Sequence, residues 1–510
     1  MRVLIFHGYL LRGTGSNIYN VSLVRALAAL EHEVCLLCQE RAAAELDLPA
    51  SVTVVNPDIG RTLPVYVADS YEDFDAVRFA DLDDAALDRY IEANVTAVRA
   101  AVEEFRPDVA LANHAVMGPA ILARGLGGRV PYAVKIHGSA LEYTVRPEPE
   151  RFLPYMLEGL RGASGVLVGS LHTAESLWEV AGDPDLPAKT RLGPPGVDVA
   201  TFRQRAADEA AAGLTQLADR LDGADPGGWG GEAGASAALR AFDPRSERIV
   251  GYVGKLIVSK GVDLLLAAWP LVCARVPDVR LLVVGFGGYR DALGEIVAAL
   301  GRGDLDALRE IASKGRELEG GPPGTLTYLT AFLDGLDDVD RAAYLAAAPA
   351  AAERIRFSGS LEHGDLPSVL PAFTAQVVPS TFPEAFGMVA AEAACCGALP
   401  LSADHSGLAE VTATLAPALP ASLRPLLSFE RGPGAVEQIA DRLVRWLELP
   451  AGERAEAAAA LSGTARRRFG WESVAEGVIA AAEGRLDELL APGSGTVEAA
   501  AARAPLAPGR

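Results

Sequence analysis

The chain is short of cations, of cysteine and of long apolar runs, and each shortage excludes a class of protein. Its 46 lysines and arginines stand against 67 acidic residues, and the formal charge of −21 disfavours binding to nucleic acid or a broad attraction to anionic membranes. Five cysteines in 510 residues do not form a disulfide framework, so we interpret them as small buried apolar residues in a reducing cytosol. No run of 18 apolar residues occurs, which predicts that there is no membrane-spanning segment. Together these shortages favour a cytoplasmic protein.

What the chain has is length and apolar residues. With 510 residues, 50% of them hydrophobic, it can bury two cores, so two domains are expected. The apolar start, residues 1–6, ends at His7-Gly8 and predicts a first strand rather than a signal peptide. Short apolar segments alternate with helical patterns through the first half, at 2–6, 33–37, 52–56, 109–112, 132–136 and 166–168. This alternation predicts an α/β fold, a parallel sheet covered by helices on both faces.

Polar side chains follow several of these predicted strands in the first half. Asn113 and His114 come after the strand that begins at Val109, and His137 comes after the next strand. The carboxyl ends of parallel strands meet at one edge of a sheet, where open α/β folds bind ligands. We therefore predict that His114, His137 and the glycine loop at Gly13 line one edge. The alternative for each histidine is a satisfied structural residue.

The glycine loop after the first strand is a weak signal for a dinucleotide. Gly13 and Gly15 begin seven residues after Phe6, and Ile18 stands where the third glycine of a Rossmann fingerprint would be. This spacing disfavours an NAD-dependent oxidoreductase. Either a longer loop over a ligand cleft or an ordinary flexible β–α loop fits these residues.

The stretch from 375 to 411 is the most informative part of the second half. Residues 375–378 predict a buried strand, and a helix is expected to start near Gly387, where its free N–H groups make an anion site. Glu384 precedes that helix, and Glu392 lies inside it among alanine, valine, methionine and cysteine. A buried carboxylate is costly unless it is hydrogen-bonded or paired, and the two hydroxyls of a ribose would satisfy it. The alternative is that Glu392 reaches solvent.

Two lysines precede another predicted helix in this half. Residues 248–253 predict a strand, Lys255 follows its end, and Lys260-Gly261 opens the next helix. Gly285 ends a further apolar strand, in a turn of a kind that is common after strands. Lysines at such a turn are often only solvated, although a helix N-terminus beside them also suits a phosphate.

These segments resemble the motifs of retaining glycosyltransferases of family four, the glycosyl transferases group 1. Glu384 and Glu392 match the E-x7-E spacing of that family, and GKLIVSKG, RFSG and KIHGSALEY are similar to its diphosphate, base-binding and active-site histidine segments. The chain departs from the family pattern at Lys255, where arginine is usual, and at Pro195, where asparagine is usual. The resemblance covers roughly residues 1–202 and 248–490. It implies a GT-B fold, with two Rossmann-like doubly wound domains facing across a cleft.

The resemblance also implies an activity and a set of residues for it. The activity is a retaining, metal-independent transfer of sugar from a nucleoside diphosphate sugar to a small-molecule, lipid or glycan acceptor, without a cofactor. The residues expected to take part in catalysis are His137, Glu384, Lys260 and Lys255. Those expected at the donor and nucleotide are Gly13, Gly15, Lys255, Lys260, Gly285, Arg356, Phe357, Ser358, Glu384, Ala385, Phe386, Gly387, Met388, Val389 and Glu392. Asn113 and His114 are expected on the acceptor side.

No metal ligands are expected. Asp81, Asp83 and Asp84 resemble the acidic start of a helix rather than a metal-binding DxD loop. The expected N-terminal, acceptor-side domain spans 1–202 and is followed by an insertion or linker at 203–247. The expected C-terminal, nucleotide-sugar domain spans 248–470 and contains a helical insertion at about 289–353. A helix at 471–490 is expected to cross back to the first domain, and residues 491–510 are expected to be a disordered tail. The donor sugar, the base, the acceptor and the oligomeric state are not predicted.

Three other functions are compatible with parts of this pattern. A sugar-nucleotide epimerase would share the architecture and the phosphate site, but it would need acid and base carboxylates in place of an acceptor pocket. An oxidoreductase would require the dinucleotide loop that the spacing disfavours. A non-catalytic protein would bind the sugar nucleotide without hydrolysing it.

Overall fold

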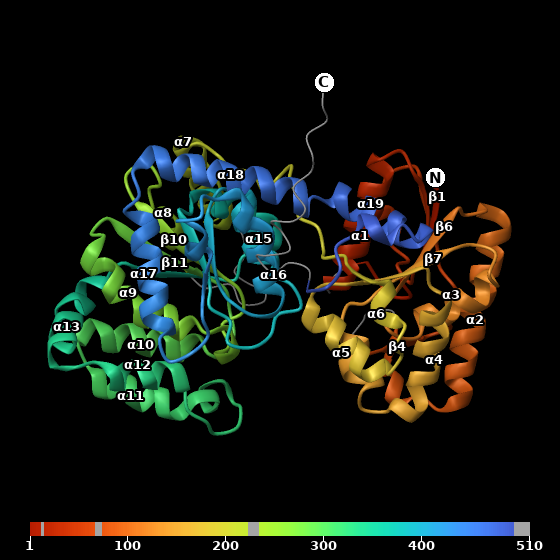
Figure 1. Cartoon of the computed structure of the whole chain (residues 1–510), viewed down its shortest axis with the longest axis horizontal. Coiled ribbons are helices and arrows are strands. Elements are labelled where there is room, and N and C mark those ends of the chain that lie inside the picture. Colours follow the sequence, from red (N-terminus) through yellow and green to blue (C-terminus); the bar gives the residue numbers. More distant parts are fainter. Residues whose placement is uncertain (12–14, 67–73, 223–233, 494–510) are drawn as a thin grey trace. The chain divides into compact units, whose positions relative to one another are not determined.

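The computed structural model describes residues 1–11, 15–66, 74–222 and 234–493 (Figure 1). Gly13 and the end of the expected tail, from residue 494 on, lie outside these ranges. The chain divides into two compact units. The N-terminal unit comprises Met1–Gly196 and the described residues from Phe469 on, and the C-terminal unit comprises Val197–Arg468.

The N-terminal unit is built on a seven-stranded parallel sheet with the order β3-β2-β1-β6-β7-β8-β9. The strands are β1 (Arg2–Phe6), β2 (Glu33–Leu37), β3 (Val52–Val55), β6 (Val109–Asn113), β7 (Tyr132–Lys135), β8 (Gly165–Val168) and β9 (Thr190–Leu192). A separate parallel pair, β4 (Thr62–Val65) and β5 (Asp75–Arg78), was not predicted from the sequence. The predicted parallel sheet is confirmed.

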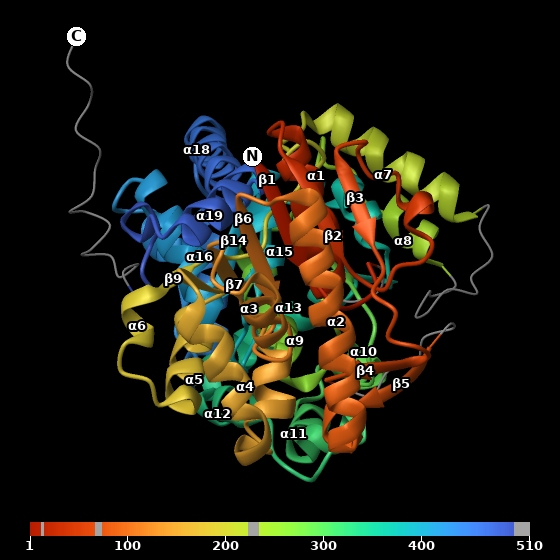
Figure 2. The same ribbon diagram turned by 90° about the vertical axis from the view of Figure 1, so that its right-hand side faces the viewer.

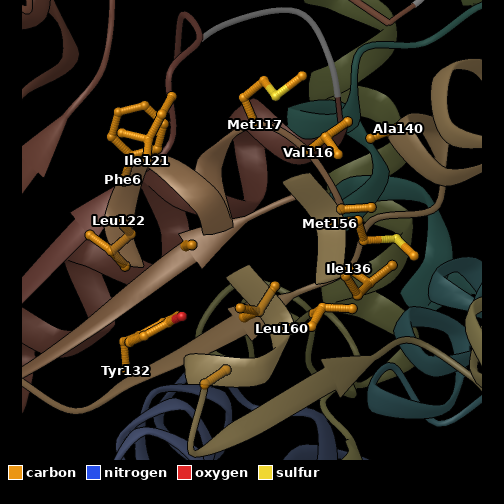
Figure 3. Close-up of a cluster of buried hydrophobic side chains, with 14 of the residues drawn as sticks. Phe6, Val116, Met117, Ile121, Leu122, Tyr132, Ile136, Ala140, Met156 and Leu160 are labelled. Atoms are coloured by element: carbon orange, nitrogen blue, oxygen red, sulfur yellow. The ribbon is translucent and has the colours of Figure 1, made fainter. Parts of the chain in front are cut away.

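Alternate residues of β1 belong to two different cores, one on each face of the sheet. Leu4 and Phe6 pack into the first core with α2 (Asp84–Phe105), α3 (Gly118–Leu126) and α4 (Pro149–Gly162). Figure 3 shows part of this core, with Phe6, Met117, Ile121 and Leu122 among its side chains. Val3 and Ile5 pack into the second core. A strand buried on both faces has to be continuously apolar, as β1 is.

The second core is completed by two helices that are far apart in the sequence. α1 (Gly15–Ala29) lies beside α19 (Trp471–Glu483), as Figures 1 and 2 show, and α19 also contacts β6, β7 and β8. Val478 and Ala481 of α19 are buried against that face. The expected C-terminal helix is therefore part of the N-terminal unit.

The C-terminal unit is built on a six-stranded parallel sheet with the order β12-β11-β10-β13-β14-β15. The strands are β10 (Arg248–Val253), β11 (Val279–Val284), β12 (Ile355–Gly359), β13 (Ala375–Val378), β14 (Leu399–Ala403) and β15 (Ser428–Phe429). The chain reverses direction across the sheet between β10 and β13, just as it does between β1 and β6 in the other unit. In open α/β sheets, ligands bind at such switch points, beyond the carboxyl ends of the strands.

Helices cover this sheet and form both regions that the sequence marked as insertions. The main covering helices are α9 (Val262–Arg275), α15 (Met388–Cys395), α16 (Ser406–Leu415) and α17 (Ala435–Leu447), and α18 (Ala451–Phe469) contacts α15 through the hydrogen bond from Ser462 to Cys395. The region expected at 289–353 forms α10 (Arg290–Arg302), α11 (Leu305–Lys314), α12 (Thr327–Gly335) and α13 (Asp338–Ala352), which is more than the helical hairpin expected, and α13 packs on α9.

The region from 203 to 247 forms two helices that pack within the C-terminal unit. α7 (Ala207–Asp222) contacts α14 (Leu366–Val369), and α8 (Ala235–Arg240) contacts the edge strand β12. This segment thus extends the C-terminal unit, and the boundary between the units falls at Gly196 rather than at residue 202. None of the described helices combines the length and the apolarity that crossing a membrane requires.

Candidate functional site

In the C-terminal unit, two loops meet beyond the ends of β10 and β13. Thr381 donates its backbone N–H to the carbonyl of Ser259 at 2.9 Å. Gly261 has φ +65°, and a Cβ at that position would lie 2.0 Å from the carbonyl oxygen of Pro379. Only glycine combines this backbone conformation with this close approach. The loop that carries Lys260 is therefore held directly against the loop that leads to α15.

Lys260 and Glu384, both predicted site residues, form an ion pair between these loops. Their side chains are 29% and 21% exposed, so the pair is partly open to a ligand. Ser380 donates its hydroxyl to the same carboxylate oxygen, and the hydroxyl of Ser406 accepts the backbone N–H of Glu384 at 2.8 Å. These four residues come from three separate segments of the chain, so tertiary packing rather than chain proximity assembles the pair. Lys255 is exposed, and its ammonium has no ion pair among the described residues.

The N-terminus of α15 lies beside this ion pair. Gly387 precedes the helix, and no side chain caps the free N–H groups there. A Cβ on Gly387 would lie 2.8 Å from Leu408, and one on Gly407 would lie 2.5 Å from the backbone of Phe386. The two glycines thus allow the segment Glu384–Gly387 to pack closely on α16. Uncapped N–H groups at a helix start favour an anion.

Glu392, within α15, is 2% exposed and is held by a residue that the sequence analysis missed. Nε2 of His363 lies 2.8 Å from Oε1 of Glu392. The imidazole also lies 5.4 Å from the ring of Phe202. The hydrogen bond to Glu392 raises the pKa of His363, and the negative charges of Glu392 and Asp198 add to that effect. The signal that could have found His363 was the need of a buried carboxylate for a partner.

The predicted nucleotide-binding residues Gly285, Arg356, Phe357 and Ser358 differ in where their groups are directed. Gly285 meets the carboxyl end of β12 through its N–H, which donates to Gly359 at 2.9 Å. Arg356 instead lies near the start of β12, and its guanidinium donates to the carbonyls of Glu353 and Ile355, both at 2.8 Å. The ring of Phe357 lies under the guanidinium of Arg290, and Ser358 is fully buried. No contact among the described residues brings Arg356 to the loops at Lys260.

In the N-terminal unit, a chain of hydrogen bonds links five residues at the ends of β1, β6 and β7 and on α1. His137 donates from Nε2 to Oδ1 of Asn113 at 2.8 Å, and Nδ2 of Asn113 donates to Oδ1 of Asn20 at 3.0 Å. Nδ2 of Asn20 in turn donates to Nδ1 of His7 at 3.0 Å. His7 then donates from Nε2 to Oδ1 of Asn17 at 2.9 Å. This pattern places the proton of His137 on Nε2 and leaves its Nδ1 as an acceptor.

Burial lowers the pKa of the three clustered imidazoles, those of His7, His114 and His137. Desolvation lowers the pKa of His7 to about 4, and it lowers the pKa of His114 and of His137 well below the usual value. The positive charge of Lys135 contributes to the shift of His137. Lys135 itself is 2% exposed, and its ammonium donates to the carbonyl of Gly193. No negative side chain among the described residues pairs with any of these groups.

His114 differs from its neighbours because neither of its ring nitrogens has a hydrogen-bond partner among the described residues. It is 2% exposed, has φ +72°, and lies against the rings of Tyr66 and His137, at 4.8 Å each. Asn113, predicted on the acceptor side, is instead 1% exposed and bonded only within the protein. Asn113 is therefore a buried hydrogen-bond partner of His137, whereas both ring nitrogens of His114 remain available to a ligand.

Two further expectations concern the glycine loop and the acidic helix start. Gly15 is exposed at the first residue of α1, with no heavy atom near its missing Cβ. Asp83 caps α2 by accepting the N–H of Ala86 at 2.6 Å, which confirms the capping interpretation of that acidic segment. In the parts of the chain that are described, no three His, Cys, Asp or Glu side chains are arranged to hold a metal ion.

Comparisons with known proteins match both units. The family model of the glycosyl transferase 4-like domain matches residues 14–188, and that of glycosyl transferases group 1 matches residues 331–466. Together the two models cover more than half of the chain.

Relatives and solved structures agree with these models. A D-inositol 3-phosphate glycosyltransferase of Frankia alni is 27% identical over 478 residues, which are 91% of this chain and 93% of that protein. A protein of the same name from Segniliparus rotundus is 28% identical over 58% of this chain and 46% of its own length. Similar folds include Anabaena HepE in complex with UDP, with a TM-score of 0.53 and 16% identity over 96% of this chain and 100% of that chain. A glycosyltransferase of Rickettsia africae has a TM-score of 0.56 and 14% identity, over 95% of this chain and 98% of that chain.

The first matched range contains His114 and His137, and the second contains Glu384 and Glu392, whereas Lys260 lies outside both ranges. These matches support a glycosyltransferase and give no support to an oxidoreductase. The chain belongs to the glycosyl transferases group 1 of glycosyltransferase family four, and it is a glycosyltransferase with the GT-B fold.

Proposed function

We propose that the enzyme transfers a sugar from a nucleoside diphosphate sugar to a hydroxylated acceptor, with retention of the anomeric configuration and without a metal ion. The observation that carries this proposal is the assembly around Lys260. An ammonium, a partly exposed carboxylate and an uncapped helix start converge beyond the switch point of the C-terminal sheet. That is the arrangement a nucleoside diphosphate requires.

In this proposal the lysines and the start of α15 stabilise the leaving diphosphate. Negative charge develops on the diphosphate as the bond to the sugar breaks, so fixed positive groups there lower the barrier most. Lys260 neutralises part of that charge, and the exposed Lys255 adds a second ammonium without the planar fork of an arginine. Glu384, released from Lys260 by the incoming phosphate, is then free to accept hydrogen bonds from sugar hydroxyls.

The N-terminal unit contributes a neutral imidazole to the same reaction. The amide of Asn113 holds the Nε2–H of His137, so Nδ1 offers a lone pair to a hydroxyl of the donor sugar. We assign His114, with its unused ring nitrogens, to the acceptor. The Frankia alni relative is named for D-inositol 3-phosphate, which makes this polyol phosphate the first acceptor to assay.

The test separates the nucleotide site from the sugar site. HepE was crystallised with UDP, so UDP is the first nucleotide to titrate by calorimetry. Lys260→Ala should weaken UDP binding about tenfold or more and lower turnover by roughly a hundredfold, because a preorganised charge at the leaving group is lost. His137→Ala should lower turnover roughly ten- to a hundredfold while UDP affinity stays the same, because a single hydrogen bond to the sugar is removed.

Two controls complete this experiment. Lys314→Ala removes an exposed lysine that pairs only with Glu310, and it should change neither quantity. Unchanged UDP affinity in Lys260→Ala would overturn the phosphate site. Proton NMR of the product reports whether the anomeric configuration is retained, and NMR of the donor kept without acceptor would reveal the epimerisation expected of a sugar-nucleotide epimerase.

A further inference from the structure

Glu392 is a buried carboxylate, and only one of its two oxygens has a hydrogen-bond partner among the described residues. It is 2% exposed and lies on α15 between Ala391 and Ala393, which are both fully buried. Oε1 is held by Nε2 of His363 at 2.8 Å, and no described residue donates a hydrogen bond to Oε2. A carboxylate in apolar surroundings needs both counter-charge and donors. Oε2 is therefore the atom that a ligand hydroxyl can satisfy.

His363 is placed to supply the counter-charge. It opens the short helix His363–Asp365, and its side chain is 57% exposed, so the imidazole can exchange protons with solvent. The charged groups that face it from neighbouring elements are Glu392 of α15 and Asp198 of the segment before α7. Both are negative and favour the imidazolium.

The acidic residues on the histidine's own element have other partners. Asp365 is buried, accepts the N–H of Glu362 at 3.1 Å, and pairs with Arg220 of α7 at 2.6 Å. Its charge is thus neutralised by Arg220 rather than directed at His363. Phe202, whose ring lies 5.4 Å away, covers another side of the imidazole without adding charge.

We propose that His363 is a positioning residue for the ribose of the nucleotide: it fixes Oε1 of Glu392 and, when protonated, balances its charge, so that Oε2 accepts one ribose hydroxyl. This inference rests on the proposed function, in which Glu392 contacts the ribose. His363 lies 29 residues before the carboxylate that it holds, so only the fold brings the two together. It touches the carboxylate and not the reacting atoms.

The proposal has two measurable consequences. Binding of a nucleotide removes the remaining water from Glu392 and adds the negative diphosphate, and both changes favour the protonated imidazole. Affinity should therefore fall as the pH rises through the pKa of His363, which lies above the ordinary value of a histidine. In addition, a single free carboxylate oxygen should favour UDP over its 2′-deoxy or 3′-deoxy analogue, depending on which hydroxyl it accepts.

The experiment is calorimetric titration of the full-length enzyme with UDP, 2′-deoxy-UDP and 3′-deoxy-UDP at pH 7.0 and 8.5, a window in which the terminal phosphate is ionised throughout (its pKa is about 6). The wild type should bind UDP roughly three- to tenfold more weakly at pH 8.5, and it should prefer UDP to one deoxy analogue roughly tenfold. His363→Gln keeps a donor for Oε1 but cannot be protonated. It should bind UDP with little pH dependence and with reduced preference for the ribose.

The control variant is His172→Gln, which removes an exposed histidine of the N-terminal unit and should retain the wild-type pattern. If His363→Gln keeps the full pH dependence and the full ribose preference, the inference about His363 is wrong. If the wild type binds all three nucleotides equally, and Glu392→Gln changes nothing, the ribose contact of the proposed function fails instead. Melting temperatures of all variants establish that the titrated proteins are folded.

Discussion

Two histidines of this enzyme form side-chain hydrogen bonds of the same length with opposite electrostatic results. His137 in the N-terminal unit donates to an amide oxygen of Asn113 at 2.8 Å, and His363 in the C-terminal unit lies 2.8 Å from a carboxylate oxygen of Glu392. The pKa of His137 is well below the ordinary value, because burial dominates and its neighbours are cationic or neutral. The pKa of His363 is raised, because a carboxylate holds it. Burial in the one case and a carboxylate partner in the other, and not the distance, account for the opposite shifts in pKa.

The same contrast extends to the ammonium groups. Lys260 of the C-terminal unit pairs with Glu384, whereas Lys135 of the N-terminal unit is buried against the carbonyl of Gly193 and the ring of Tyr19. Burial without an anionic partner lowers the pKa of Lys135 to about 7. The candidate site of the C-terminal unit thus pairs opposite charges, Lys260 with Glu384. In the buried cluster of the N-terminal unit, by contrast, no described carboxylate pairs with Lys135 or with the three imidazoles.

The largest effect is expected from removing the ammonium of Lys135, which has no anionic partner among the described residues. An ammonium whose pKa is lowered from 10.5 to about 7 destabilises the fold fully below pH 7, and the penalty fades as the pH rises toward 10.5, because the folded state then releases the proton first. Lys135→Met should raise the free energy of unfolding by roughly 2–4 kcal/mol at pH 7, after the lost hydrogen bond to Gly193 is taken into account. Urea denaturation measures this gain.

The pH dependence makes the prediction specific. The difference in stability between Lys135→Met and the wild type should shrink by roughly 3 kcal/mol between pH 7 and pH 9.5. Lys314→Met, which removes an exposed lysine that pairs with Glu310, provides the matched control and should show no such trend. A stability difference that is independent of pH would mean that the fold does not lower the pKa of Lys135.

Strand alternation predicted much of the fold, because it follows from local patterns. Continuous apolar runs such as residues 2–6 predict buried parallel strands, and both sheets are parallel as expected. The alternation could not show that residues 203–247 would pack on β12 and α14, since an alanine-rich helix carries little information about its partner. The pair β4 and β5 was missed because those strands are short and half polar.

The candidate site was predicted where a family motif marked it and missed where only tertiary packing creates it. Lys260 and Glu384 were assigned to one site before the structure showed their ion pair across 124 residues. Asn113, the partner of His137, is hydrogen-bonded to Asn20, which lies 93 residues away in the sequence, and no sequence motif links these two positions. For the same reason Asn113 was assigned to the acceptor side, although the structure uses its side chain entirely within the protein.

A smaller perturbation would convert one histidine environment into the other. Asn113→Asp is nearly isosteric and places a carboxylate at the atom that now accepts from His137. It should raise the pKa of His137 by about one to two units, worth about 1.4–2.7 kcal/mol, because an opposite charge within hydrogen-bonding distance favours the imidazolium. NMR titration of the imidazole protons measures the shift. Since a protonated His137 cannot accept at Nδ1, turnover should also fall on the acidic side of the new pKa.

The matched control for this variant is Asn94→Asp on α2. Asn94 is fully buried and donates to the carbonyl of Tyr90 at 2.8 Å, so the same substitution there tests the cost of a buried carboxyl group without altering His137. Asn94→Asp should leave the titration of His137 in place. If Asn113→Asp also leaves it in place, then burial alone sets the protonation state of His137, and the contrast between the amide and the carboxylate partner fails.

The smallest expected effect concerns His114, whose ring nitrogens have no hydrogen-bond partner among the described residues. Both ring nitrogens of His114 are buried without a hydrogen bond among the described residues, so the side chain costs folding free energy that a bound acceptor would return. His114→Leu should leave the melting temperature unchanged or raise it by about 2–4 °C, since roughly 1 kcal/mol is at stake in a unit of this size and the positive φ offsets part of the gain. Turnover should fall in the same variant.

The comparison that gives this result meaning is His7→Leu in the same cluster. Both ring nitrogens of His7 form hydrogen bonds, one with Asn17 and one with Asn20. Replacing His7 by leucine removes these two hydrogen bonds and should therefore lower the melting temperature. Opposite signs for one substitution at two neighbouring imidazoles would show that His114 is retained for a ligand and His7 for the fold. If both variants melt earlier by the same amount, His114 supports the fold as His7 does, and the acceptor must be recognised elsewhere in the protein.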